Sequence, residues 1–186
     1  MCMREKKLSK RERSRIKIMH TARMLFEEHG IENVTFQQIA DEAEVCRTTV
    51  FNHFATTKDL MLALYLHEIS QVKEYCDQAN EEGIPLIRMM FDKLIEDTVC
   101  YPALVSQMAT NAVLKKEEDK PISMFEDMVK ANLPEEVEDR DAMAILIVGA
   151  FYVLTNHYHS NNKAFDAPVL KQEFQHLLDI LLEKYI

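Results

Sequence analysis

The sequence predicts an all-α protein, and three features support this fold class. Only three of its 186 residues are glycine, and Leu, Met, Ala, Glu and Lys, which favour helices, are frequent. Apolar residues recur at spacings of three and four, whereas no segment alternates as a half-buried strand does. Because 47% of the residues are hydrophobic, the chain can also bury a substantial core.

Three helices are predicted before residue 57. The first runs from about Lys10 to His29, and Gly30 is placed to cap it in a left-handed conformation. The second begins after Thr35, which has the spacing of a capping box with Gln38. The predicted buried positions of these two helices are Ile18, Ala22, Leu25, Phe26, Phe36, Ile39, Ala40 and Ala43.

The third helix lies within VCRTTVFNHF, residues 45–54, and is short and polar. Val50 and Phe54, four residues apart, form its only apolar face, so most of its hydrogen-bonding side chains face outwards. Two helices joined by a turn of three to four residues form a helix-turn-helix, whose second helix can enter a DNA major groove. We therefore expect residues 1–57 to form a DNA-binding domain with a basic N-terminal arm.

Residues 58–186 are predicted to form a second domain, a helical bundle for ligand binding and dimerisation. Its first helix spans about residues 58–79, and Thr57 is placed to cap it. Prolines suit the first turn of a helix and mark most of the later helix starts. The remaining predicted helices cover about residues 85–99, 102–114, 121–132, 141–157 and 168 onwards.

The last two of these helices predict a homodimer. Residues 141–157 are apolar on almost every side, and a single subunit of this size covers such a helix with difficulty. We expect a four-helix bundle between two copies, with a fully internal core helix as the alternative. The predicted interface residues are Phe151, Leu154, Phe174, Leu178, Leu181 and Leu182.

The net charge of −9 conceals a strong asymmetry. Residues 1–23 contain nine basic and two acidic residues, a balance of +7, so the rest of the chain carries −16. A basic end on an acidic body indicates contact with a polyanion, with a solvated tail as the alternative. The scattered cysteines and the absence of a secretory signal or membrane-spanning run predict a cytoplasmic protein without membrane association.

Residues 18–64 read IMHTARMLFEEHGIENVTFQQIADEAEVCRTTVFNHFATTKDLMLAL and resemble the DNA-binding domain of TetR-family transcriptional regulators. The resemblance covers about a quarter of the chain. It includes the Leu25–Phe26 pair, Gly30, Thr35, Ile39–Ala40, Ala43, Val45, Val50–Phe51, His53–Phe54, Lys58 and Leu60. The DNA contacts that it implies come from Thr35, Arg47, Thr48, Thr49, Phe51, Asn52, His53 and Lys58.

Three positions depart from the pattern of the family. Glu44 stands where the family usually has glycine, so the turn must form without that residue's conformational freedom. Phe51 stands where tyrosine is common, and it cannot donate a hydroxyl to phosphate. Cys46 replaces the frequent serine or threonine, and cysteine is a weaker helix cap.

The middle helices are rich in methionine, which adapts to irregular shapes. Ordinary core packing explains this, but the family resemblance favours a pocket for a small apolar or amphipathic effector. The predicted pocket residues are Tyr65, His67, Met89, Met90, Tyr101, Met108, Met124, Phe125, Met128, Tyr152 and Asn156.

Other chemistry has little support in the sequence. His157 and His159 lie two residues apart on a helix and so point to different faces, which argues against a metal site. No phosphate loop, nucleophile elbow or metalloprotease motif is present, so we expect neither an enzyme nor a cofactor.

The sequence therefore predicts a dimeric, ligand-responsive repressor. We expect an effector to release it from a double-stranded DNA operator, which for a dimer is palindromic. The alternative is a helical small-molecule-binding or adaptor protein whose basic N-terminal arm contacts RNA or a protein partner.

Overall fold

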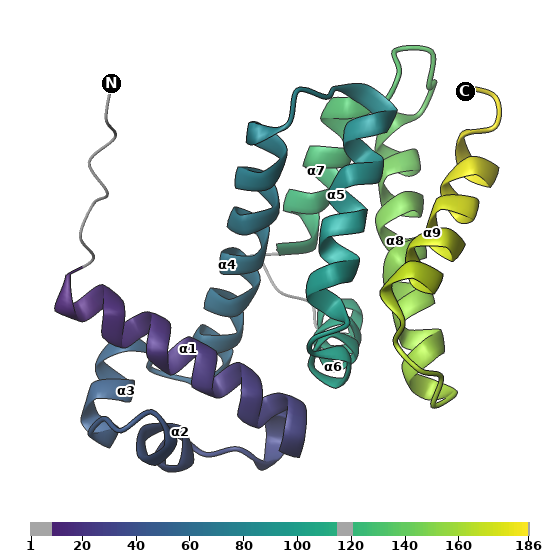
Figure 1. Cartoon of the computed structure of the whole chain (residues 1–186). Coiled ribbons are helices and arrows are strands. Elements are labelled where there is room, and N and C mark those ends of the chain that lie inside the picture. The colour runs from purple at the N-terminus through teal and green to yellow at the C-terminus, as the bar shows by residue number, and fades with distance from the viewer. Residues whose placement is uncertain (1–8, 115–120, 186) are drawn as a thin grey trace. The chain divides into compact units, whose positions relative to one another are not determined.

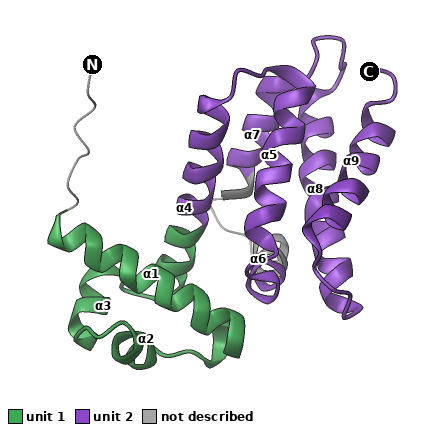
Figure 2. Ribbon diagram, viewed as in Figure 1, with its two compact units in different colours: residues 1–64 green, residues 65–186 purple. Residues whose placement is uncertain are grey.

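The computed structural model describes residues 9–114 and 121–185, and within these ranges it contains helices and no strand (Figure 1). The all-α prediction is therefore confirmed. The chain divides into two compact units, residues 1–64 and 65–186 (Figure 2). The domain boundary predicted after residue 57 lies before this division, at the start of α4 (Thr57–Gln78). The first turns of α4 belong to unit 1, where Leu60 and Leu64 are buried.

From residue 9 onwards, unit 1 contains a long first helix and two short ones before the start of α4. Their bounds, with those of a short 3-10 helix, are α1 (Lys10–His29), η1 (Ile31–Asn33), α2 (Phe36–Glu42) and α3 (Arg47–His53). Ser9 and Glu12 form a capping box at the start of α1, and Thr35 and Gln38 form the predicted one at the start of α2. Gly30 has the positive φ expected of it, 82°, but its ψ of 149° lies outside the left-handed helical region.

The core of unit 1 joins its helices through a small set of fully buried apolar side chains. Ile18, Ala22 and Phe26 come from α1, while Leu25, which we also expected to be buried, is half-buried. The other helices contribute Ile39, Ala40, Ala43, Val50, Phe54 and Leu60. The apolar periodicity of the sequence therefore identified the inward face of each helix.

The turn between α2 and α3 is a Schellman motif built without glycine. The Val45 N–H donates to the Ala40 carbonyl at 2.9 Å, and the Glu44 N–H donates to the Asp41 carbonyl at 3.1 Å. Glu44 takes the left-handed position of this motif with a φ of 51°, which is strained for any residue with a Cβ. Its carboxylate pairs with Lys17 of α1 at 2.8 Å, and this contact lowers the pKa of Glu44.

In its described residues, unit 2 contains the rest of α4 and five further helices. These are α5 (Gly83–Thr98), α6 (Pro102–Leu114), α7 (Pro121–Asn132), α8 (Arg140–Ser160) and α9 (Ala167–Leu182). The bounds predicted for α6 and α7 are confirmed, whereas α5 begins earlier than expected, at Gly83 rather than Pro85. Thr57 was also the wrong cap for α4, because the Thr56 hydroxyl accepts from the Asp59 N–H and Thr57 is already helical.

Three buried phenylalanines mark the centre of unit 2. Phe91 of α5 packs against both Phe174 of α9 and Phe151 of α8, with ring centroids 4.5 and 5.7 Å away. Phe151 and Phe174 meet edge to face at 6.1 Å. Because aromatic rings bury large areas and pack with specific geometry, this triad fixes the mutual packing of the three helices.

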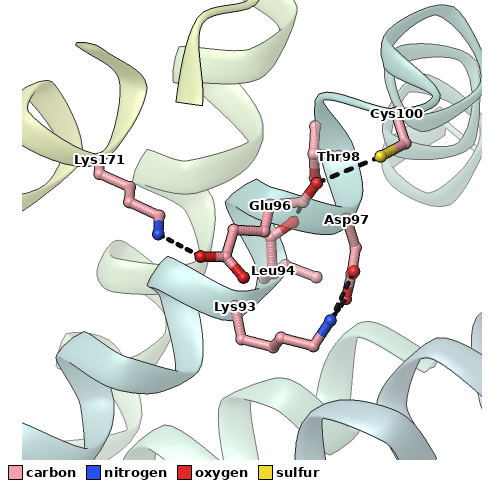
Figure 3. A network of polar contacts seen from close by, with 7 residues as sticks. All are labelled: Lys93, Leu94, Glu96, Asp97, Thr98, Cys100 and Lys171. Atoms are coloured by element: carbon pink, nitrogen blue, oxygen red, sulfur yellow. Dashed lines mark hydrogen bonds and ion pairs between the residues drawn. The ribbon is translucent and has the colours of Figure 1, made fainter. Parts of the chain in front are cut away.

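Polar contacts along α5 and α9 support the same packing (Figure 3). Lys171 of α9 pairs with Glu96 of α5 at 2.6 Å, and Arg88 of α5 donates to Gln175 of α9. Within α5, Lys93 pairs with Asp97 at 2.6 Å. Figure 3 shows these ion pairs with the Thr98 hydroxyl, which donates to a backbone carbonyl one turn earlier in α5.

Candidate functional site

Helix α3 divides into a buried face and an exposed face. Val50 is fully buried, and Phe54, which ends the helix, is nearly so. Arg47, Thr48 and Asn52 are exposed, and Arg47 and Thr48 lie in the first turn. This arrangement anchors the helix by one side and leaves hydrogen-bonding side chains on the other, as reading the edges of base pairs in a major groove requires.

An aromatic contact positions Arg47. Phe51, which is 44% exposed, meets Phe36 of α2 edge to face with ring centroids 5.0 Å apart. The Arg47 guanidinium carbon lies 5.2 Å from the centroid of the Phe51 ring, within cation–π range. Phe51 therefore orders the arginine at the N-terminal end of α3, a role that does not need the missing tyrosine hydroxyl.

The other predicted DNA contacts near α3 differ in exposure and in hydrogen bonding. The Thr35 hydroxyl donates to the Gln38 side chain at 2.8 Å, so it is already engaged as part of the cap of α2. Thr49 is half-buried, and Lys58 is exposed in the first turn of α4. Cys46, the N-cap of α3, makes no side-chain capping hydrogen bond, as its chemistry predicted.

His53, the last residue of α3, lies under the N-terminal part of α1. The Arg15 guanidinium donates to the His53 carbonyl at 3.3 Å and lies 4.4 Å from the centroid of the Phe54 ring. Burial lowers the pKa of His53, and the charges of Arg11 and Arg15 lower it further. Neither arginine was among the predicted site residues, although their spacing continues the row of Ile18 and Ala22 on the inward face of α1.

The sequence pattern described as "Bacterial regulatory proteins, tetR family" matches residues 18–64, which are α2, α3, most of α1 and the start of α4. Residues 18–64 therefore match the TetR family. A relative, the HTH-type transcriptional repressor AcnR of Corynebacterium glutamicum, is 26% identical over 131 residues. This alignment covers 67% of the present chain and 66% of AcnR, slightly less than two thirds of that protein.

Solved TetR-family structures resemble the chain over nearly its whole length. FadR of Thermus thermophilus, a TetR-family repressor solved with lauroyl-CoA, has a TM-score of 0.63 at 18% identity and covers 92% of this chain and 95% of its own. FadR of Bacillus subtilis, solved with stearoyl-CoA, has a TM-score of 0.68 at 14% identity, with coverages of 88% and 96%. At 18% and 14% identity, the similarity shows a shared fold, which extends over both units of the chain.

The predicted effector residues fall into three groups in unit 2. Met90, Met108 and Phe125 are buried, and Tyr65, Met89, Tyr101, Met128 and Tyr152 are half-buried. Met124 is exposed, so its predicted place in the interior was wrong. His67 and Asn156, predicted as polar contacts of the pocket, are also exposed, and the Asn156 side chain accepts a hydrogen bond from the buried Ser106 at 3.1 Å. Helical periodicity could not exclude them because α4, α7 and α8 carry apolar side chains on more than one face.

Two tyrosines bring polar groups into this interior. The Tyr65 hydroxyl is buried, and in the described part of the chain it has no hydrogen-bond partner. Burial raises the pKa of Tyr65 and of Tyr152, and the neighbouring Glu126 and Glu68 raise that of Tyr152 further. Both hydroxyls therefore stay protonated and can donate a hydrogen bond to a bound molecule.

The predicted dimerisation residues need a correction. Phe151, Leu154, Phe174, Leu178 and Leu182 are buried within the core of unit 2 and are not available to a second chain, while Leu181 is half-buried. The exposed apolar residues of the same two helices are others, which we call the α8/α9 apolar surface: Ile145, Leu146, Val153, Val169 and Ile180. The stronger apolar stripe of each helix faces its own core, and the weaker one faces outwards.

No further chemistry emerges from the described residues. Within them, no group of three or more His, Cys, Asp or Glu side chains could hold a metal ion. His157 contacts the Asn161 side chain at 3.2 Å, one turn later in the chain. Across the same residues, no helix has the length and apolar character needed to cross a membrane.

Proposed function

We propose that this protein is a dimeric, ligand-responsive transcriptional repressor that reads a palindromic DNA operator through α3. The observation that carries the proposal is the division of α3 into a buried anchor, Val50 and Phe54, and an exposed face with Arg47, Thr48 and Asn52. Arginine can donate two hydrogen bonds to guanine, and threonine can contact a base or a phosphate. The similarity to the repressor AcnR supports repression as the direction of regulation.

The α8/α9 apolar surface supports the homodimer. Ile145, Leu146 and Val153 fall within about 100° of arc on α8, since each residue advances by about 100°. Gly149 lies on the same arc, and a Cβ added there would meet no atom within 4 Å. A second copy of α8 can thus approach closely along this arc, and a two-fold axis would then pair each apolar side chain with the same surface on the partner.

Unit 2 would bind the effector. Its interior offers deformable methionines together with the protonated Tyr65 and Tyr152 hydroxyls, a combination that suits an apolar molecule with a polar acceptor group. Acyl-CoA complexes of the two FadR proteins support an amphipathic molecule of this kind. Because α4 begins in unit 1 and ends in unit 2, an effector that binds one position of α4 more tightly would shift the DNA-binding equilibrium.

Two substitutions in unit 1 test how the protein reads DNA, using a sequence selected by the wild-type protein from a random pool. Arg47→Ala should cost about 1–3 kcal/mol on the selected DNA and relax the preference at one base pair per half-site. Lys58→Ala should weaken selected and scrambled DNA alike and reduce the slope of log affinity against log salt by about one per protomer.

Binding isotherms at several salt concentrations give both quantities. If Arg47→Ala weakens both DNAs equally and Lys58→Ala changes base preference, the orientation of α3 is wrong. If the random pool yields no preferred sequence for the wild-type protein, the proposed function fails.

A further inference from the structure

The basic residues of α1 lie on two different faces of the helix. Arg11 and Arg15, one turn apart, share a row with the buried Ile18 and Ala22, so they point towards the core side of unit 1. Arg13, two residues from each, lies roughly 200° away around the helix, and both Arg11 and Arg13 are exposed. The same charge therefore occurs on both sides of α1, and only one side adjoins the end of α3.

Contacts with α3 hold the inward side in place. Arg15 is half-buried, donates to the His53 carbonyl at 3.3 Å and stacks over the Phe54 ring at 4.4 Å. These two contacts fix the guanidinium beside the last turn of α3, so less conformational entropy remains to be lost when it binds a ligand. Arg11 lies one turn before Arg15 on the same face of α1.

The positive charge at this position has no counter-charge among the residues that the structure describes. Neither Arg11 nor Arg15 forms an ion pair with any carboxylate in the described parts of the chain, 9–114 and 121–185. Arg15, and Arg11 one turn before it, thus lie on one face of α1 without an ion-pair partner among these residues. Guanidinium groups bind phosphate through paired, charge-assisted hydrogen bonds, and a phosphate would offset the charge of both arginines.

We propose that Arg11, Arg15 and His53 form a site for a backbone phosphate of double-stranded DNA beside the C-terminal end of α3. This inference rests on the proposed function, because the phosphate belongs to the DNA that α3 reads. Double-stranded RNA fits less well, since its deep and narrow major groove does not admit a helix. The site begins before residue 18, so it extends the DNA contacts beyond the segment shared with the family.

The site also gives α1 a role different from that of a mobile basic tail. A tail follows phosphates without fixing the protein on the duplex, whereas Arg15 is attached to the helix that reads the bases. If Arg11 and Arg15 bind one phosphate at this position, they set the angle at which α3 enters the major groove. Arg11 and Arg15 should therefore act as positioning residues that contact the backbone and carry no base preference themselves.

The test compares Arg11→Ala with Arg13→Ala, which removes the same charge from the opposite face of α1. DNA selected by the wild-type protein and scrambled DNA are titrated at several salt concentrations. Arg11→Ala should lower the salt slope by about 0.9 per protomer and weaken both DNAs by a similar factor, whereas Arg13→Ala should keep the wild-type slope. Arg15→Met, which keeps an apolar stem over Phe54, should lower the slope as Arg11→Ala does.

Equal slopes for Arg11→Ala and Arg13→Ala would overturn the site. A salt slope that falls in Arg11→Ala but not in Arg15→Met would also overturn the site, provided that Arg15→Met melts as the wild type does. Both outcomes leave the proposed function standing as long as the wild-type protein still prefers its selected DNA. Tighter binding of the wild-type protein to duplex RNA than to the selected DNA would overturn both.

Discussion

Replacing Val153 with glutamate should separate the proposed dimer into folded protomers. Val153 is 71% exposed in the middle of α8, so its side chain makes few contacts within its own unit. Leu178 of α9, by contrast, is 0% exposed and belongs to the core of unit 2. The same change at these two positions should therefore have opposite consequences, dissociation in the first case and unfolding in the second.

The expected size of the first effect follows from the exposed surface. Burying a whole valine side chain contributes about 1.5–3 kcal/mol, so the exposed part of Val153 accounts for about 1–2 kcal/mol in each protomer. Two-fold symmetry doubles this contribution to about 2–4 kcal/mol per dimer. The dissociation constant should thus rise by about 30-fold to about 1000-fold, and the desolvation of two carboxylates would add to this.

Leu178→Glu should instead unfold the chain. An unpaired carboxylate in the core costs several kcal/mol in addition to the lost apolar packing, a total comparable with the whole stability of a typical domain, about 5–15 kcal/mol. Sedimentation velocity over a range of concentrations, with a thermal melt of each variant, distinguishes dissociation from unfolding.

A matched control is Met24→Glu, since Met24 is 50% exposed on α1 in unit 1. It should leave both the dissociation constant and the melting temperature close to wild-type values. If Val153→Glu dissociates no more readily than Met24→Glu, the α8/α9 apolar surface is not the dimer interface.

Three further predictions concern unit 1 and the interior of unit 2. The free protein holds the pKa of His53 below its usual value and a bound phosphate would raise it, so DNA binding takes up a proton and the affinity at constant salt should rise as pH falls between about 8 and 5. His53→Gln should remove this rise in affinity, and an equal pH response in the variant would contradict the prediction. Cys46→Ser should supply the missing cap of α3 and stabilise the fold by about 0.5–2 kcal/mol in urea denaturation, whereas Cys46→Ala, the control, should not. Tyr65→Phe should keep or raise the melting temperature of the ligand-free protein, since it removes a buried hydroxyl that has no hydrogen-bond partner among the described residues, and a clear loss of stability would show that this hydroxyl is paired.

The sequence predicted most of the local structure because the signals for it are local. Pro102 and Pro121 suit only the first turn of a helix, and both begin the helices that they were expected to begin. Thr35 and Gln38 form their capping box from residues three apart. Val50 and Phe54, whose spacing of four residues predicted that they face inwards, are likewise buried.

Two features could not be read from the sequence because they depend on distant contacts. The side of α9 that faces the core is fixed by packing on Phe91 and Phe151 of other helices, so the strong stripe at Leu178 was mistaken for a surface. The contact between Arg15 and the carbonyl of His53 joins residues 38 positions apart. Periodicity places Arg15 on the inward face of its helix, but it does not say which partner lies opposite.

The capping box at the start of α1 bears on where the DNA-binding unit physically begins. The segment shared with the family starts at Ile18, in the middle of a helix that runs from Lys10. A fragment trimmed to that residue would lose the Ser9 cap and two turns of α1, and it would uncover the Phe54 ring beneath Arg15. Short helices without caps fray readily in water, so Ile18 itself would lie in a frayed end. The smallest piece of this chain that keeps α3 properly supported therefore starts at Ser9 or before it, nine residues ahead of the boundary that sequence similarity alone would draw.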